Sequence, residues 1–290
     1  MSKVSLIVPS RNEQFLPQTI TDILAKAVGD TEVISVLDGY WPDPILPDDP
    51  RLTLIHFSQS LGMRNAINAA AAIAKGEYLL KCDAHVMFDH GFDEILAADC
   101  DEDWVVIPRR HRLDAENWCL QETTKPPIDY EYLSYPFWHP DDPGMHGQIW
   151  NERTLERMDK PEYEIDNNMS FQGSCWFMSA RHFHDFLGGL SEVGYGSFKQ
   201  EAQEIGLKTW LGGGQIKINK RTWVAHLHKG RKYGRGYSMD KNELRSASDW
   251  CTDHWMNNRW EGRQHDLSWL IEKFAPVPTW SDNWREIWTP

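Results

Sequence analysis

The sequence predicts an α/β protein whose mixed, mostly parallel sheet is flanked by helices. Short β-rich runs alternate with helical patterns over the first 110 residues, and further strand and helix patterns follow from about residue 170. The composition, 41% hydrophobic and 25% charged, is that of a compact globular protein. A length of 290 residues suits one large domain. We divide it into two halves, 1–110 and 111–230, and a C-terminal helical extension, 231–290.

The first half is expected to contain five strands and two helices. The strand patterns cover residues 4–8, 32–37, 53–57, 77–82 and 104–108. The helical patterns cover residues 14–27 and 61–74, and the second of them ends at Lys75-Gly76. This alternation is typical of parallel strands joined by helices.

From about residue 111 the sequence becomes rich in Pro, Trp and Tyr, which indicates substrate-facing loops. Strands are expected at 171–179, 215–219 and 222–227, and helices at 180–187, 198–210 and 241–258. Lys, Arg, Tyr and Gly gather between residues 229 and 237, where we expect a mobile loop.

Composition and charge disfavour several classes of protein. The net charge of -13 opposes broad binding to nucleic-acid phosphates. The longest apolar run is far below the roughly 18 residues that a membrane span needs, and the N-terminus lacks the pattern of a signal peptide. Five widely spaced cysteines without a C-x-x-C pair indicate reduced thiols rather than disulfides or a zinc site. We therefore expect a cytoplasmic protein.

The strand expected to end at Cys82 is followed by an acid and a histidine two positions apart, Asp83 and His85. Side chains two apart in an extended chain project to the same side, so the pair could share a divalent cation such as Mn²⁺. Ligands of open α/β sheets bind beyond the carboxyl ends of the strands, where this pair falls. The alternative interpretation is a surface turn in which His85 only caps the strand.

Several motifs together resemble a known family. V-S-L-I-V-P-S-R-N-E, L-G-M-R-N-A-I-N-A-A, G-E-Y-L-L and C-D-A-H-V resemble the nucleotide-sugar half of GT-A fold glycosyltransferases. The D-x-H form, the acidic segment 201–214, V-A-H at 224–226 and the sequence 241–255 are similar to polypeptide N-acetylgalactosaminyltransferases. The resemblance implies a Rossmann-like GT-A fold, with a nucleotide-sugar-binding half at 1–110 and an acceptor-side half at 111–230.

The same resemblance implies the ligands of a metal. Asp83, His85 and His226 would hold Mn²⁺ or Mg²⁺, and the metal would bridge the two phosphates of a UDP-sugar. His228 could replace His226, although the position of the motif favours His226. An ordinary strand histidine is the plain alternative for His226.

Other positions would contact the donor. The resemblance places four residues of the loop on the leaving group: Lys229, Arg231, Lys232 and Tyr233. It places three more near the donor: Asp38, Arg64 and Gly173. A solvated basic loop and an exposed arginine at a helix start are the alternatives, and Leu37 departs from the acidic pair that many GT-A enzymes carry at this point.

Glu201 and Glu204 lie three apart on a predicted helix and share one face, so both could point into the cleft. In an inverting enzyme such a carboxylate would be the general base. In a retaining enzyme, as the resembled family is, the two acids would position the acceptor and the sugar. A solvated helix face is the alternative.

These observations predict a metal-dependent glycosyltransferase that moves a hexose or N-acetylhexosamine from a UDP-sugar to a hydroxyl, with retention. The acceptor stays open between a protein Ser or Thr, a glycan or small molecule, and a hydroxymethylated pyrimidine in phage-type DNA. For DNA, basic residues at 109–112 and 229–235 could form a phosphate-binding rim. The alternatives are an inactive sugar-nucleotide or carbohydrate-binding module that uses the Trp-rich tail, and a nucleotidyltransferase.

Overall fold

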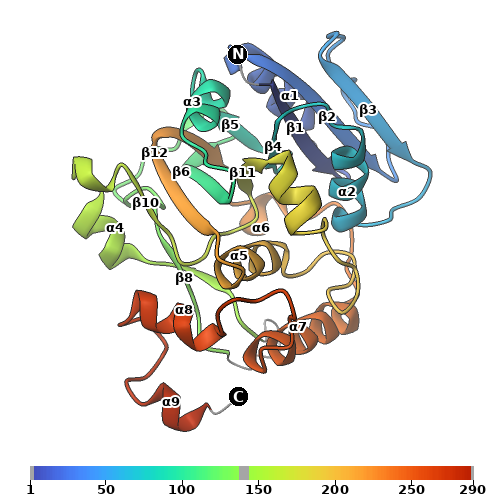
Figure 1. Cartoon of the computed structure of the whole chain (residues 1–290). Helices are drawn as coiled ribbons and strands as arrows, with labels where there is room; N and C mark the ends of the chain where they lie inside the picture. The colour runs from blue at the N-terminus through green and yellow to red at the C-terminus, as the bar shows by residue number, and fades with distance from the viewer. Residues whose placement is uncertain (1–2, 137–143, 289–290) are drawn as a thin grey trace.

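The computed structural model describes residues 3–136 and 144–288, which form a central sheet with helices packed around it (Figure 1). The strand order is β10-β12-β6-β11-β4-β1-β2-β3. The strands on this path are β1 (Lys3–Ser10), β2 (Asp30–Asp38), β3 (Leu52–Phe57), β4 (Tyr78–Cys82), β6 (Trp104–Asp114), β10 (Ile165–Asn167), β11 (Cys175–Ser179) and β12 (Gln215–His226).

The sheet is mixed and mostly parallel, as the sequence predicts. Strand β1 pairs in parallel with β2 and β4, β2 with β3, and β6 with β12. Strand β11 lies antiparallel between β4 and β6 and joins the two halves. Short strands extend the sheet or stand beside it: β5 (Val86–Phe88), β7 (Cys119–Leu120), β8 (Glu131–Leu133) and β9 (Gly147–Ile149).

Two apolar clusters cover the two faces of the sheet, because side chains alternate along each strand. On β1, Ile7 belongs to one cluster, and Leu6 and Val8 belong to the other. Helices α2 (Met63–Ile73) and α5 (Glu201–Leu211) contribute to the cluster of Ile7, whereas α1 (Leu16–Lys26) and α3 (Phe92–Ala98) contribute to the opposite one. The remaining helices are α4 (Asn151–Arg157), α6 (Gly230–Tyr233), α7 (Lys241–Met256), α8 (Leu267–Phe274) and α9 (Trp284–Ile287).

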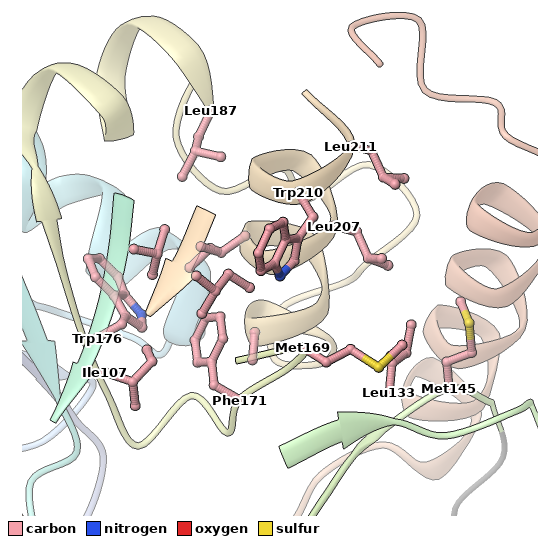
Figure 2. Packing of buried hydrophobic residues seen from close by; sticks show 14 of the residues in the cluster. Ile107, Leu133, Met145, Met169, Phe171, Trp176, Leu187, Leu207, Trp210 and Leu211 are labelled. Atoms are coloured by element: carbon pink, nitrogen blue, oxygen red, sulfur yellow. The ribbon is translucent and has the colours of Figure 1, made fainter. Parts of the chain in front are cut away.

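The larger cluster continues from the sheet into the C-terminal helices. Figure 2 shows Trp210 of α5 close to Phe171, with Met169 and Met145 extending the packing away from the sheet. The tail docks on this core partly through an indole hydrogen bond, since Trp280 donates to the Leu133 carbonyl at 2.8 Å. The buried tryptophans of the tail are therefore packing residues, which disfavours a carbohydrate-binding role for them.

The sequence prediction differs from the structure in a few elements. The two strands expected at 215–227 form one strand, β12, with a register shift between Asn219 and Trp223. The helix expected at 180–187 is largely a short π-helical turn, His182–Phe186. The five cysteines, all within the described residues, are free thiols, as expected.

Among the described residues, no helix is both long and apolar enough to cross a membrane. The expected cytoplasmic location stays a prediction.

Candidate active site

A cavity of about 1100 Å³ opens beyond the carboxyl ends of β1, β4 and β12. In an open α/β sheet this is the edge where ligands bind. Ser10, Asp83 and His226, which lie at or just after these three strand ends, are among its lining residues. Residues 226–230 and 234–235 also line the cavity, so the segment after β12 forms part of its wall.

Asp83, His85 and His226 converge in this cavity. One ligand atom from each lies within 4.8 Å of the others, and no further group of this kind occurs in the described part of the chain. Asp83 Oδ2 lies 3.2 Å from His226 Nε2 and 3.8 Å from His85 Nε2. A carboxylate oxygen and two imidazole nitrogens at this spacing suit Mn²⁺.

The protonation of these groups also suits a cation. Burial lowers the pKa of His226 to about 3, so its imidazole is neutral at physiological pH. Although burial opposes the ionisation of Asp83, the Lys81 ammonium and the two imidazoles hold the pKa of Asp83 well below its usual range. An ionised Asp83 and a neutral His226 are the charge states in which these side chains bind a metal.

Lys81 is a residue of this site that the sequence reasoning missed. Its side chain is 1% exposed and contacts both Asp83 Oδ1, at 3.0 Å, and Glu201 Oε2, at 3.3 Å. It also donates to the Gly173 carbonyl. The signal was present in Y-L-L-K-C, because a lysine inside an apolar strand needs a buried partner.

Glu201 reaches the cavity as expected, at the start of α5. The Trp176 indole donates to its Oε1 at 2.6 Å, while Lys81 holds its Oε2. Burial raises the pKa of Glu201, and Lys81 partly offsets this effect. Gly173 also lines the cavity and lies against the same carboxylate, because a Cβ at this glycine would stand 2.6 Å from Glu201 Oε2.

Arg64 and Glu204 do not line the cavity, in contrast to their expected roles. They form a fully buried ion pair with each other, and Arg64 also donates to the Ser191 and Lys199 carbonyls. The reason is helical geometry: Glu201 begins α5 at the cavity, whereas Glu204 lies almost a turn further into the core. The geometry favours a structural role for this pair.

Asp38 lines the cavity, but its carboxylate is already engaged. It accepts hydrogen bonds from the Ser60 hydroxyl at 2.7 Å and from the backbone N–H groups of Leu61 and Gly62. These contacts fix the turn that leads into α2. Any contact of Asp38 with a sugar-nucleotide would have to use a carboxylate that already accepts these hydrogen bonds.

The four loop residues expected at the leaving group fall into two sets. Lys229 lines the cavity and pairs with Glu13. Arg231, Lys232 and Tyr233 do not line it and lie on the short helix α6. Lys232 pairs with Glu116 instead.

From the same segment, Arg235 and Tyr237 line the cavity. The Tyr237 ring lies against the guanidinium of Arg11, whose Cζ is 4.4 Å from the ring centroid. Sequence spacing could not single out Arg235 and Tyr237, because their positions depend on how this segment folds back over the β1–α1 loop.

Several cations of the expected phosphate rim are paired within the chain. Arg109 makes two hydrogen bonds to Asp129, at 2.8 and 2.7 Å, and Arg110 forms a buried pair with Glu131. With the pairs of Lys229 and Lys232, four of the seven Lys and Arg residues at 109–112 and 229–235 have an acidic partner. These pairs reduce the positive charge that such a rim would present to DNA phosphates.

The fold and the site define a class of protein. The crystal structure of GalNAc-T7 with UDP, GalNAc and Mn²⁺ superposes on this chain with a TM-score of 0.66 at 15% sequence identity. The match covers 95% of this chain and 57% of that chain. The crystal structure of S. aureus TarS 1–349 in complex with UDP-GlcNAc superposes with a TM-score of 0.56 at 13% identity, over 92% of this chain and 69% of that one. The chain has the GT-A glycosyltransferase fold.

Sequence comparison identifies the family. The model of glycosyl transferase family 2 matches residues 5–150, half of the chain, and the protein belongs to this family. It is also 24% identical over 261 residues to a putative polypeptide N-acetylgalactosaminyltransferase 13 of Drosophila melanogaster. That match covers 79% of this chain and 42% of the relative, so the chain spans less than half the length of this relative.

Proposed function

We propose that this protein is a glycosyltransferase that moves a hexose or N-acetylhexosamine from a UDP-sugar to an acceptor hydroxyl with the help of Mn²⁺ or Mg²⁺. The convergence of Asp83, His85 and His226 in the cavity of a family 2 chain carries this proposal. The complexes of GalNAc-T7 with UDP, GalNAc and Mn²⁺ and of TarS with UDP-GlcNAc support the choice of donor and metal.

The residues present fit a divalent metal. Asp83 supplies an ionised oxygen, His226 supplies a neutral imidazole, and His85 turns its Nε2 toward the same point. When bound, the metal would neutralise the charge that develops on the departing diphosphate. Lys229, at the cavity wall beside this cluster, is the protein cation placed to assist.

Glu201 is the acid that the start of α5 brings to the cavity, and its contacts favour a positioning role. Both of its oxygens are held, one by the Trp176 indole and the other by the Lys81 ammonium. A carboxylate held in this way is poorly placed to remove a proton from an acceptor. This arrangement supports retention of configuration over an inverting mechanism with a protein base.

The acceptor that we propose is a hydroxyl of a protein, a glycan or a small molecule rather than of DNA. The net charge of -13 and the internal pairing of Arg109, Arg110, Lys229 and Lys232 reduce the positive charge that the protein offers to DNA phosphates. Binding to duplex DNA should therefore be weak and show little dependence on salt.

The test is UDP release by the purified protein across a panel of UDP-sugars, with Mn²⁺ and with EDTA. We expect metal-dependent release from at least one donor, lost in Asp83→Ala and kept in Asp48→Ala, which changes an exposed acid outside the cavity. Thermal stabilisation by UDP and Mn²⁺ without any release would favour the inactive binding module. Neither release nor stabilisation would overturn the proposed function.

A further inference from the structure

The loop between β1 and α1 carries a buried acid that belongs to none of the expected site residues. Glu13 lines the cavity and is 7% exposed. Its Oε1 accepts the backbone N–H of Phe15 at 3.2 Å, which fixes the carboxylate on its own loop. Its Oε2 contacts two side chains from distant parts of the chain, His85 and Lys229.

The contact with Glu13 determines which nitrogen of the His85 ring carries the proton. His85 Nδ1 lies 3.1 Å from Glu13 Oε2, and an ionised carboxylate can only accept a hydrogen bond. The proton of a neutral His85 therefore sits on Nδ1, which leaves the lone pair of Nε2 directed toward Asp83. This is the tautomer that can coordinate a metal at the cluster.

His226 provides an internal comparison. Its Nε2 faces Asp83 at 3.2 Å, but its Nδ1 has no hydrogen-bond partner among the described residues. Of the two histidines in the cluster, only His85 therefore has a carboxylate on the ring nitrogen that faces away from Asp83.

The same Glu13 oxygen also accepts from Lys229, which belongs to the segment after β12 that lines the cavity. The two residues before Glu13 contact that segment as well. Asn12 donates to the Gly236 carbonyl at 2.9 Å, and Arg11 lies over the Tyr237 ring. Three consecutive residues thus anchor the segment, and the third of them also touches the metal cluster.

We propose that Glu13 is a positioning residue of the metal centre: it fixes His85 in its metal-binding tautomer and holds Lys229 beside the cluster. The proposal rests on the proposed function, since it concerns the same metal. It adds that the segment after β12 and the metal cluster are joined through one carboxylate. Loss of that carboxylate should weaken metal binding through His85, without removing any of the three ligands.

The first experiment measures Mn²⁺ affinity of the full chain by electron paramagnetic resonance of free Mn²⁺, without any donor. We expect Glu13→Gln to weaken Mn²⁺ binding by about tenfold to a hundredfold, the range typical of carboxylates that orient a ligating histidine. Glu116→Gln is the matched control, because Glu116 also pairs with a lysine of this segment, Lys232, but is absent from the cavity lining. It should leave the affinity unchanged.

A double-mutant cycle separates positioning from a merely structural role. In a His85→Ala background, Glu13→Gln should change the Mn²⁺ affinity little, because its effect passes through the ring that is missing. Equal losses with and without His85 would overturn the proposal. If the wild type binds Mn²⁺ and Glu13→Gln binds it equally well, the Glu13 proposal fails while the proposed function stands; if the wild type binds none, the proposed function fails first.

A measurement on the wild type keeps the proposal testable should Glu13→Gln not fold. Nitrogen-15 spectra of histidine-labelled protein at about pH 8, where free imidazoles are neutral, report which ring nitrogen carries the proton. We expect the His85 signal to show a protonated Nδ1 in the metal-free protein. A proton on Nε2 alone would overturn the assignment.

Discussion

Replacement of Lys81 by methionine tests how much its ion pairs with Asp83 and Glu201 stabilise the protein. The Lys81 ammonium lies 3.0 Å from Asp83 Oδ1 and 3.3 Å from Glu201 Oε2, and the side chain is 1% exposed. With an effective dielectric constant of about 20, Coulomb's law gives a gross attraction of about 5 kcal/mol for each contact. Part of this is offset by the cost of burying the ammonium.

Because Glu201 would remain buried, and Asp83 partly buried, without their cation, we expect Lys81→Met to lower the free energy of unfolding by about 3–5 kcal/mol at about pH 8. The pH dependence has a definite sign. Burial already raises the pKa of Glu201, and loss of Lys81 should raise it further. Between the ordinary pKa of a glutamate and this raised value, the folded variant therefore binds more protons than the unfolded variant. Its stability therefore increases as the pH falls, and the deficit should shrink toward about pH 5.

Urea denaturation followed by tryptophan fluorescence, at both pH values and without metal, is the assay. Lys208→Met is the matched control, since Lys208 contacts Glu204 Oε1 at 2.8 Å but leaves that carboxylate paired with Arg64. It should cost about 1 kcal/mol or less, as partly exposed pairs do. Equal stabilities of wild type and Lys81→Met at about pH 8, or a deficit that grows toward acid pH, would refute the reasoning.

Three further predictions concern the acids of α5, a buried histidine and a glycine. Glu204→Gln should lower the free energy of unfolding by about 3 kcal/mol, whereas Glu201→Gln should chiefly lower UDP-release turnover. Urea denaturation and initial rates measure the two effects, and the reverse pattern would place Glu204 rather than Glu201 in the active site. Burial lowers the pKa of His182 to about 4, so protonation of this residue alone should cost the wild type about 3 kcal/mol as the pH falls from about 6.5 to about 4. His182→Gln should therefore lose less stability than the wild type over this range in denaturation curves. Gly173→Ala puts a Cβ 2.6 Å from Glu201 Oε2 and should reduce turnover more than stability, and an unchanged rate would contradict this placement.

The sequence could predict the metal cluster because its information is local. Asp83 and His85 follow one apolar strand directly, and His226 ends another, so strand geometry and the family resemblance suffice to bring them to one edge. The five strands and two helices expected in the first half follow for the same reason, since hydrophobic periodicity is a property of short windows. The short strand β5 and the helix α3 of the same half were not predicted.

The pairing of charges could not be predicted in this way. Glu201 lies 120 residues from Lys81, and Glu204 lies 140 residues from Arg64. Whether such an acid faces the cavity or a buried cation depends on tertiary packing, which spacing along one helix does not encode. The sequence therefore indicated that α5 carries two acids on one face, but it could not tell which of them reaches the site.

The charges around Asp83 and Glu201 give a reason why a metal and a nucleotide would bind in the same site. Asp83, Glu201 and Glu13 contact only two protein cations there, Lys81 and Lys229. Three carboxylates and two ammonium groups leave one negative charge, which repels a diphosphate. A bound divalent cation would change this to one positive charge, because the cation's own charge belongs to the local balance. If the proposed function holds, we expect the nucleotide to bind after the metal, and Glu13 contacts both His85 and Lys229.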